Sequence, residues 1–319
     1  MTAAALVLSL TILSGSGAAT RDPWIVFVGS PDGATKSFQL FRVRLSGSGL
    51  EPVTHGRRNA DDPAFSPDGR QLAFARLGAG IFAVKLDGTG LRRLTPGAAD
   101  RYPVWSPDGT AIAFLSAYRN ELSLYVMRAN GKERRRLRLT PAPASRASWT
   151  PNGRSLLVQA GGGLLQVDAR TGKVQRRLGI SVELGPSEAV PSFSPNGRRV
   201  VYVGRRPEPA GCERTACEVF ALYLARTSES KSRRFIDDVG PAGWSPDSQR
   251  IVFLNRSGLE VRSLLGGQPR SITIELNALF GDAPPRLAAD PPLEIPAVGG
   301  RSEGDGFPAG RAGIVKEHF

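Results

Sequence analysis

The sequence predicts an all-β fold, a six-bladed β-propeller built from four-stranded antiparallel blades. Three observations lead to it: a recurring motif, apolar alternation after each copy, and a composition rich in Gly and Pro, with 37 and 25 residues. The motif is an aromatic residue followed by Ser or Thr, Pro, Asp or Asn, and Gly, which Ser replaces in the last copy. Copies lie about 40 to 50 residues apart, the length of one supersecondary unit. Their hydroxyl residues are Ser66, Ser106, Thr150, Ser194 and Ser245.

Each repeat reads as four short strands, which we label A to D. Strand A ends in the aromatic residue, and strand B, after the turn, carries apolar residues at every second position, such as Leu72 and Phe74. Strand C and the start of strand D align between copies, LFRVRLSGSGLEPVT at 40–54 against IFAVKLDGTGLRRLT at 81–95. Four antiparallel strands in about 40 residues are typical of a propeller blade. The B and C pairs, which predict six blades, begin at Ile25, Leu72, Ile112, Leu156, Val200 and Ile251.

The motif itself is predicted to be structural. Pro fixes φ at the second position of a tight turn, Asp bonds back to nearby amides, and Gly relieves crowding at the end of the turn. Two copies carry the full set, Pro67, Asp68 and Gly69 in one and Pro107, Asp108 and Gly109 in the next. The aromatic residues are expected to pack between neighbouring blades; they are Phe65, Trp105, Trp149, Phe193 and Trp244.

The two ends of the chain differ from the repeats. Residues 1–19 are predicted to be a signal peptide, since an apolar stretch is followed by small residues with Ala18 and Ala19 at a plausible cleavage site. The alternative is an ordinary buried strand. Residues 20–276 form the predicted propeller, and 277–319 a Gly- and Pro-rich tail that is largely disordered. The first blade lacks a strand A, which either 6–13 or 293–298 would supply.

Cys212 and Cys217 are separated by four residues in PEPAGCERTACEVF. In an oxidising compartment such a pair would close a small loop, which agrees with export. A zinc site needs more ligands, and the two histidines, His55 and His318, lie far from these cysteines in the sequence. We therefore predict a disulfide, and neither a metal nor a cofactor.

The formal net charge is +13. Such a charge suits anionic polymers or lipid headgroups, and it equally fits arginines that simply decorate solvated positions. Four basic runs fall at the start of strand D, at residues 92–93, 134–136, 176–177 and 233–234. They either protect exposed edge strands from pairing or form a rim that docks an anionic polymer or a membrane. Nucleic acid is not expected as a partner.

No catalytic residue is predicted. The sequence has no Gly-x-Ser-x-Gly elbow in a strand-to-helix context, and His55 reads as a solvated loop residue. Acidic pairs occur at 61–62 and 237–238, but adjacent residues on an extended chain point in opposite directions, which makes them poor acid and base pairs. The chain is therefore expected not to be an enzyme.

Topology indicates where binding would occur. The D to A loops and the B to C loops share one face of a propeller, and loops on a rigid scaffold are where binding usually takes place. The insertion with the two cysteines is a B to C loop on that face. The candidate binding residues are Arg57, Arg58, Asp61, Asp62, Arg101, Arg146, Cys212 and Cys217.

Over about residues 24 to 273, the repeat resembles the WD-like propeller repeats of the TolB type, whose unit reads approximately PxWSPDGxxIAFxS, then LYVMDADG, then RRLT. The resemblance implies a six-bladed propeller in the periplasm or cell envelope, working as a non-catalytic scaffold that binds envelope proteins, lipoproteins among them. Two alternatives remain open: a binding module for anionic cell-wall polymer or carbohydrate, and a subunit of a secreted hydrolase or lyase completed by another chain.

Overall fold

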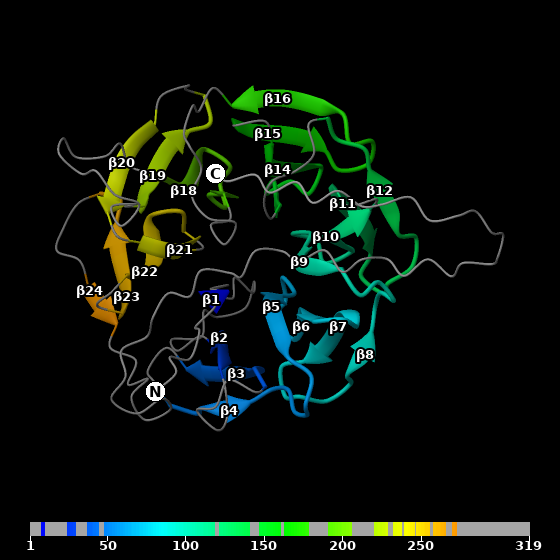
Figure 1. Ribbon diagram of the computed structural model, residues 1–319. Helices are drawn as coiled ribbons and strands as arrows, with labels where there is room; N and C mark the ends of the chain where they lie inside the picture. The colour runs from blue at the N-terminus through cyan, green and yellow to red at the C-terminus, as the bar shows by residue number, and fades with distance from the viewer. Residues whose placement is uncertain are drawn as a thin grey trace, which may run out of the picture.

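A computed structural model describes residues 8–9, 24–29, 37–44, 48–118, 121–140, 147–160, 163–178, 191–205, 220–228, 232–237, 239–245, 247–255, 258–265 and 270–272. Among these residues there is no helix that is long and apolar enough to cross a membrane. All regular structure there is strand, arranged as six antiparallel four-stranded sheets around a common centre (Figure 1). The prediction of a six-bladed β-propeller is confirmed.

The blades follow one another along the chain. Blade one consists of β1 (Leu8–Ser9), β2 (Trp24–Gly29), β3 (Gln39–Arg44) and β4 (Glu51–Pro52). Blade two consists of β5 (Ala60–Phe65), β6 (Gln71–Arg76), β7 (Gly80–Lys85) and β8 (Arg92–Arg93). Blade three consists of β9 (Arg101–Trp105), β10 (Ala111–Tyr118), β11 (Glu121–Arg128) and β12 (Arg135–Leu137).

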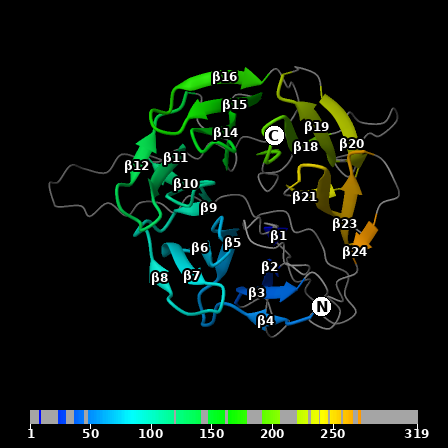
Figure 2. The ribbon, with the colours of Figure 1, turned by 180° about the vertical axis from the view of Figure 1, so that it is seen from behind.

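The second half of the ring repeats this order, with the first strand of each blade innermost (Figure 2). Blade four consists of β13 (Ser148–Trp149), β14 (Ser155–Ala160), β15 (Gly163–Asp168) and β16 (Val174–Leu178). Blade five consists of β17 (Ser192–Phe193), β18 (Arg199–Arg205), β19 (Phe220–Arg226) and β20 (Ser232–Asp237). Blade six consists of β21 (Val239–Trp244), β22 (Arg250–Asn255), β23 (Gly258–Ser263) and β24 (Arg270–Ile272).

The innermost strand of blade one comes from the N-terminal apolar segment. In β1, Leu8 is the antiparallel partner of Phe27, and Ser9 is the partner of Val26. Of the two segments expected to complete this blade, the structure thus uses the one within 6–13. The other, 293–298, lies outside the described residues. Whether residues 1–19 are also a cleaved signal peptide stays a prediction.

The core lies between blades. Five clusters of buried apolar residues each join two consecutive blades, from the first to the sixth. The aromatic residue of each motif belongs to one of these clusters, as the sequence predicts, because it points from its own strand A toward the preceding blade. These residues are Phe65, Trp105, Trp149, Phe193 and Trp244.

The turn motif closes through its hydroxyl group. Ser66 Oγ donates to Asp68 Oδ1 across 2.6 Å and accepts from the amide of Gln71 across 2.9 Å. The amide of Gly69 donates to the carbonyl oxygen of Ser66 across 2.8 Å, and Gly69 has φ 67°, a left-handed conformation that favours glycine. Beside the predicted roles of Pro, Asp and Gly, the structure shows that the Ser66 hydroxyl group links the two sides of the turn.

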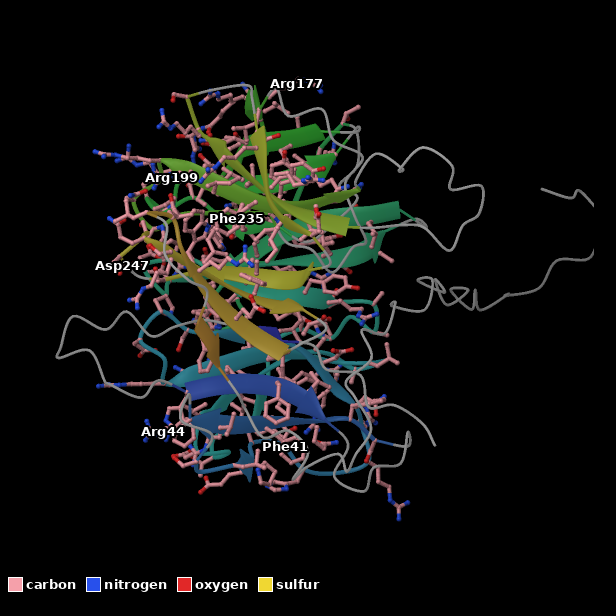
Figure 3. The ribbon with its side chains drawn as sticks, turned by 90° about the vertical axis from the view of Figure 1, so that its left-hand side faces the viewer. Phe41, Arg44, Arg177, Arg199, Phe235 and Asp247 are labelled. Carbon is pink, nitrogen blue, oxygen red and sulfur yellow. The ribbon has the colours of Figure 1, made fainter. Side chains whose placement is uncertain are left out.

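The disc has two faces, which we name by what forms them. The turn face consists of the A to B turns and the adjoining C to D turns, joined by backbone hydrogen bonds such as Leu86 N to Arg70 O, 2.9 Å. In the side view, Arg44, Arg199 and Asp247 all lie along this face (Figure 3). The loop face, opposite, consists of the B to C turns and D to A loops, of which 53–60, 76–80 and 94–100 are described throughout.

Candidate functional site

An ion-pair cluster on the loop face links blades two and three. Arg101 begins β9, and its Nη2 lies 3.3 Å from Asp61 Oδ2 while its Nε lies 3.4 Å from Asp62 Oδ2. Asp62 is deeply buried, with 2% of its side chain exposed, against 32% for Asp61. The structure therefore brings together three of the residues predicted for the binding face, and it does so through one guanidinium shared by two carboxylates.

The expectation that adjacent acids at 61–62 point in opposite directions is wrong. It assumed an extended backbone, but Asp62 has φ 52°, and the pairing of β5 with β6 shifts register between Asp61 and Ala64. This local irregularity turns both carboxylates toward Arg101. Tyr102, which follows Arg101 at the corresponding place in β9, has φ 57°. Non-glycine residues in this region cost free energy and tend to occur at functional sites.

A second ion pair lies beside the first. The Asp100 side chain is fully buried, and Arg134 Nη2 lies 3.2 Å from its Oδ1. The Arg134 guanidinium also lies over the rings of Tyr125 and Phe114, 4.5 and 5.2 Å from their centroids. In the sequence, Arg134 stands out only as part of a basic run at the outer strand, and no signal there joins it to Asp100, 34 residues away.

A cationic patch lies at the junction of blades one and two, formed by Arg58, Arg76 and Leu77. Arg76 ends β6, where it is the cross-strand partner of Ala60, two residues after Arg58. Its guanidinium lies over Phe82 and Phe74, at 5.2 and 5.7 Å. Burial, and then the charge of Arg58, lower the pKa of Arg76 from its usual value. Arg remains protonated despite such a shift, so the patch holds two positive charges.

The three residues of the patch differ in exposure and in hydrogen bonding. The Nε of Arg76 is buried and has no hydrogen-bond partner in the part of the chain that the structure describes. Arg58 is exposed and forms no ion pair with another described residue. Leu77, next to Arg76 in the B to C turn, has 62% of its surface exposed. Arg58 and Leu77 are thus presented to solvent, with the half-buried guanidinium of Arg76 beside them.

The loop that carries Arg58 is held by the buried side chain of Gln39. Gln39 begins β3 and is buried, and its Nε2 donates to the carbonyl oxygens of Gly56 and Arg58 at 2.9 and 3.1 Å. Thr54 Oγ1 in turn donates to Gln39 Oε1 across 2.9 Å. Sequence reasoning missed Gln39 because its role depends on a contact with the loop that follows a different strand.

Of the other predicted site residues, Arg57 is described by the structure and three are not. Arg57 is exposed in the same loop as Arg58, and His55 is exposed there as well. Arg146, Cys212 and Cys217 lie outside the described residues, so the predicted disulfide is not observed or excluded. Within the described ranges, no group of three or more His, Cys, Asp or Glu side chains is arranged to hold a metal ion.

Several arginines of the outer strands serve to join blades. Arg92 Nη2 donates to the carbonyl oxygen of Ala129 across 3.3 Å, and Arg135 Nη2 donates to that of Ala169 across 2.7 Å. Arg42, one strand further in, makes the corresponding bond to Leu86 at 2.9 Å. Part of the predicted rim is therefore engaged with the next blade, a role that neither of the two interpretations in the sequence analysis included.

Residues 34–215, more than half of the chain, match the TolB beta propeller domain family. The uncharacterized peptidase YuxL of Bacillus subtilis is 28% identical over 177 residues, which cover 54% of this chain and 25% of that protein. The Tol-Pal system protein TolB of Zymomonas mobilis is 38% identical over 82 residues, 24% of this chain and 18% of that protein. The crystal structure of TolB from Acinetobacter baumannii has a TM-score of 0.60 at 20% identity, over 76% of this chain and 63% of that chain.

The chain thus spans a quarter or less of the length of these two curated relatives, and less than two thirds of the TolB structure. At 20% identity the structural likeness concerns the fold. The family match covers the end of blade one, blades two, three and four, and part of blade five, and it includes the ion-pair cluster and the patch of Arg58, Arg76 and Leu77.

Proposed function

Because the chain belongs to the TolB beta propeller domain family, we propose that it is an exported, non-catalytic scaffold at the cell envelope that binds a protein partner through its loop face. The observation that carries the proposal is the patch of Arg58, Arg76 and Leu77. It combines two positive charges, of which Arg58 is exposed, with an exposed apolar side chain. Such a combination is typical of interface anchors, in which Arg is enriched.

The chemistry of the patch suggests an acidic segment as its occupant. A guanidinium presents a planar set of donors that matches a carboxylate, and Arg76 is held over Phe74 and Phe82, which limits the entropy lost on binding. A partner segment with one or two carboxylates beside an apolar residue would contact all three members of the patch. Gln39 supports this use, because it holds the loop that carries Arg58 in one position.

The non-catalytic part of the proposal rests on how the loop-face carboxylates are used. Asp61 and Asp62 share Arg101, and Asp100 pairs with Arg134, so each of these acids is already engaged with a guanidinium of the next strands. Ion pairs of this kind hold blades in position. The relative named a peptidase is matched over a quarter of its length, and its activity is not carried over to this chain.

Export is proposed from the apolar N-terminal segment together with the family. The Zymomonas relative is named a Tol-Pal system protein, and the propeller repeats resemble those of envelope proteins. Leu8 and Ser9 lie within the predicted signal peptide and also form β1. N-terminal sequencing of the protein recovered from an envelope fraction tests this point: a start near Thr20 supports cleavage, and recovery from the cytoplasm alone overturns export.

Affinity capture from a solubilised envelope fraction tests the binding role. The bait is the whole chain, compared with Arg58→Glu on the loop face and with Arg154→Glu on the turn face. The two variants change the net charge equally, and both residues are exposed. We expect one defined protein to be retained by the unmodified chain and by Arg154→Glu, and lost with Arg58→Glu.

Two outcomes would count against the scaffold. Retention by all three baits would mean that the patch is not the binding site. Recovery of chiefly anionic polymer, eluted by salt and lost equally with both variants, would favour the alternative of a polymer-binding module, since exposed charges more than about 8 Å apart are screened at physiological salt.

A further inference from the structure

The turn face carries an array of exposed cations that the sequence analysis did not single out. They lie in the A to B turns, in the C to D turns and at the adjoining strand ends, and they come from blades two to six. The exposed members are Arg70, Lys85, Arg128, Lys132, Arg154, Arg170, Lys173, Arg198, Arg226 and Arg250. These ten cations all lie on the side of the disc opposite the proposed partner site.

The carboxylates on this face are fewer and are occupied. Asp68, Asp108 and Asp247 accept hydrogen bonds from the hydroxyl groups of their own turns, which fixes their position. Asp87 and Asp168 do the same in C to D turns. Among the described residues, Arg128 pairs with Glu133 at 2.7 Å and Arg250 with Asp247 at 3.2 Å. By contrast, Arg70, Arg154 and Arg198 form no ion pair with any other residue that the structure describes.

The three unpaired arginines occupy one structural position. Each follows the Gly of its turn motif, and its carbonyl oxygen accepts a backbone hydrogen bond from the end of strand C, at 2.9, 3.0 and 3.0 Å for Arg70, Arg154 and Arg198. The same bond in three blades sets the three residues at the same level of the disc. The side view agrees, since Arg44, Arg199 and Asp247 line one side of the molecule (Figure 3).

We propose that the turn face docks on an anionic membrane surface, with its cations against lipid phosphate groups. Cations that lie at one level and are spread around a disc match the plane of charge at a membrane surface. A linear anionic polymer is usually bound instead by a stripe or groove of cations. The backbone hydrogen bonds of the turns keep the array rigid, so the turns lose little conformational entropy when they dock on the membrane. In this orientation the loop face points away from the lipid. The inference rests on different residues from the proposed function and does not depend on it.

Vesicle co-sedimentation tests the proposal with the full chain. The probes are vesicles of phosphatidylcholine alone and vesicles that also contain phosphatidylglycerol, each at low and at physiological salt. The variant Arg154→Gln with Arg198→Gln removes two turn-face charges, and the matched control Arg57→Gln with Arg58→Gln removes two from the loop face. A cation near an anionic surface is worth about a fivefold change in partitioning, so two are worth about 30-fold.

We expect binding to the anionic vesicles only, weaker at higher salt, reduced about 30-fold by the turn-face variant and little changed by the control. Thermal unfolding of both variants shows that they fold. Equal losses for the two variants would overturn the proposal, because net charge rather than one face would then govern binding. An absence of binding to anionic vesicles would also overturn the proposal. The same holds if soluble polyphosphate binds the chain and the vesicles do not displace it.

Discussion

The indole Nε1 of Trp149 donates a hydrogen bond to the carbonyl oxygen of Val104, across 3.1 Å and from one blade to the preceding one. Trp244 makes the same bond to Ser192 at 3.2 Å. Trp105 occupies the equivalent place in blade three, but its Nε1 is buried without a hydrogen-bond partner among the described residues. The motif aromatic therefore joins blades in two ways, by apolar burial in every copy and by a polar bond in two of them.

This difference between two tryptophans can be measured. We expect Trp149→Phe to lower the free energy of unfolding by about 1 kcal/mol more than its lost packing alone, because a hydrogen bond disappears. Trp105→Phe loses packing but also removes a buried donor that has no partner, so its loss should be the smaller of the two. Urea unfolding of both variants checks this, and a larger loss for Trp105→Phe would contradict it.

The architecture could be predicted from the sequence, and the ion-pair cluster could not. The turn motif recurs at a near-constant spacing and each copy contains its own local hydrogen bonds, so the pattern is visible without tertiary information. The position of Asp62 depends instead on a left-handed backbone, which is uncommon outside glycine, and the equivalent residue one blade later is Tyr102. No residue pattern marks that conformation, which arises from the strand pairing around it.

The last copy of the motif offers a test of backbone strain. Ser248 replaces the Gly of the turn and has φ 58°, and its Oγ accepts a hydrogen bond from the amide of Asn196 across 3.1 Å. Ser248→Ala should lower the free energy of unfolding by about 1 kcal/mol or more, because the acceptor is lost and the strain stays. Ser248→Gly loses the same acceptor but relieves the left-handed conformation, which is worth about 1 kcal/mol.

We therefore expect the glycine variant to be the more stable of the two, as measured by thermal unfolding. Gly109→Ala is the matched control, since Gly109 has φ 72° in the same turn of blade three and should lose stability when a side chain is added. An alanine variant of Ser248 that equals the glycine variant would show that φ 58° carries little strain there.

The ion pair of Arg101 with Asp62 is expected to contribute more to stability than its ion pair with Asp61. Arg101→Met should lower the free energy of unfolding by about 3 kcal/mol, because the buried Asp62 loses its cationic partner. Asp61→Asn should cost about 1 kcal/mol or less, since that side chain is partly exposed. Urea unfolding measures both, and adding Asp62→Asn to Arg101→Met should recover part of the loss. A full loss in that double variant would mean that the charge on Asp62 is not the cause.

The turn carboxylates predict an acid dependence of stability that the natural asparagine copies lack. The hydrogen bond from Ser106, followed by that from the Thr110 amide, holds the pKa of Asp108 below its usual value of 3.8. A carboxylate whose pKa is lowered in the folded state contributes stability that is fully present above the unfolded value and is lost as the pH falls through the folded value.

Asp108→Asn removes that contribution while keeping the turn, because Asn152 accepts the same two bonds in blade four, from Thr150 at 2.7 Å and from the amide of Arg154 at 3.0 Å. We expect the unmodified chain to be the more stable at neutral pH by a small margin, since the carboxylate is mostly exposed to solvent. The margin should shrink as the pH falls below the usual value of 3.8 and vanish below the folded pKa of Asp108. Urea unfolding across this range measures it. The reverse substitution Asn152→Asp should introduce the same acid-dependent loss, and a margin that is constant with pH in both cases would contradict the assignment.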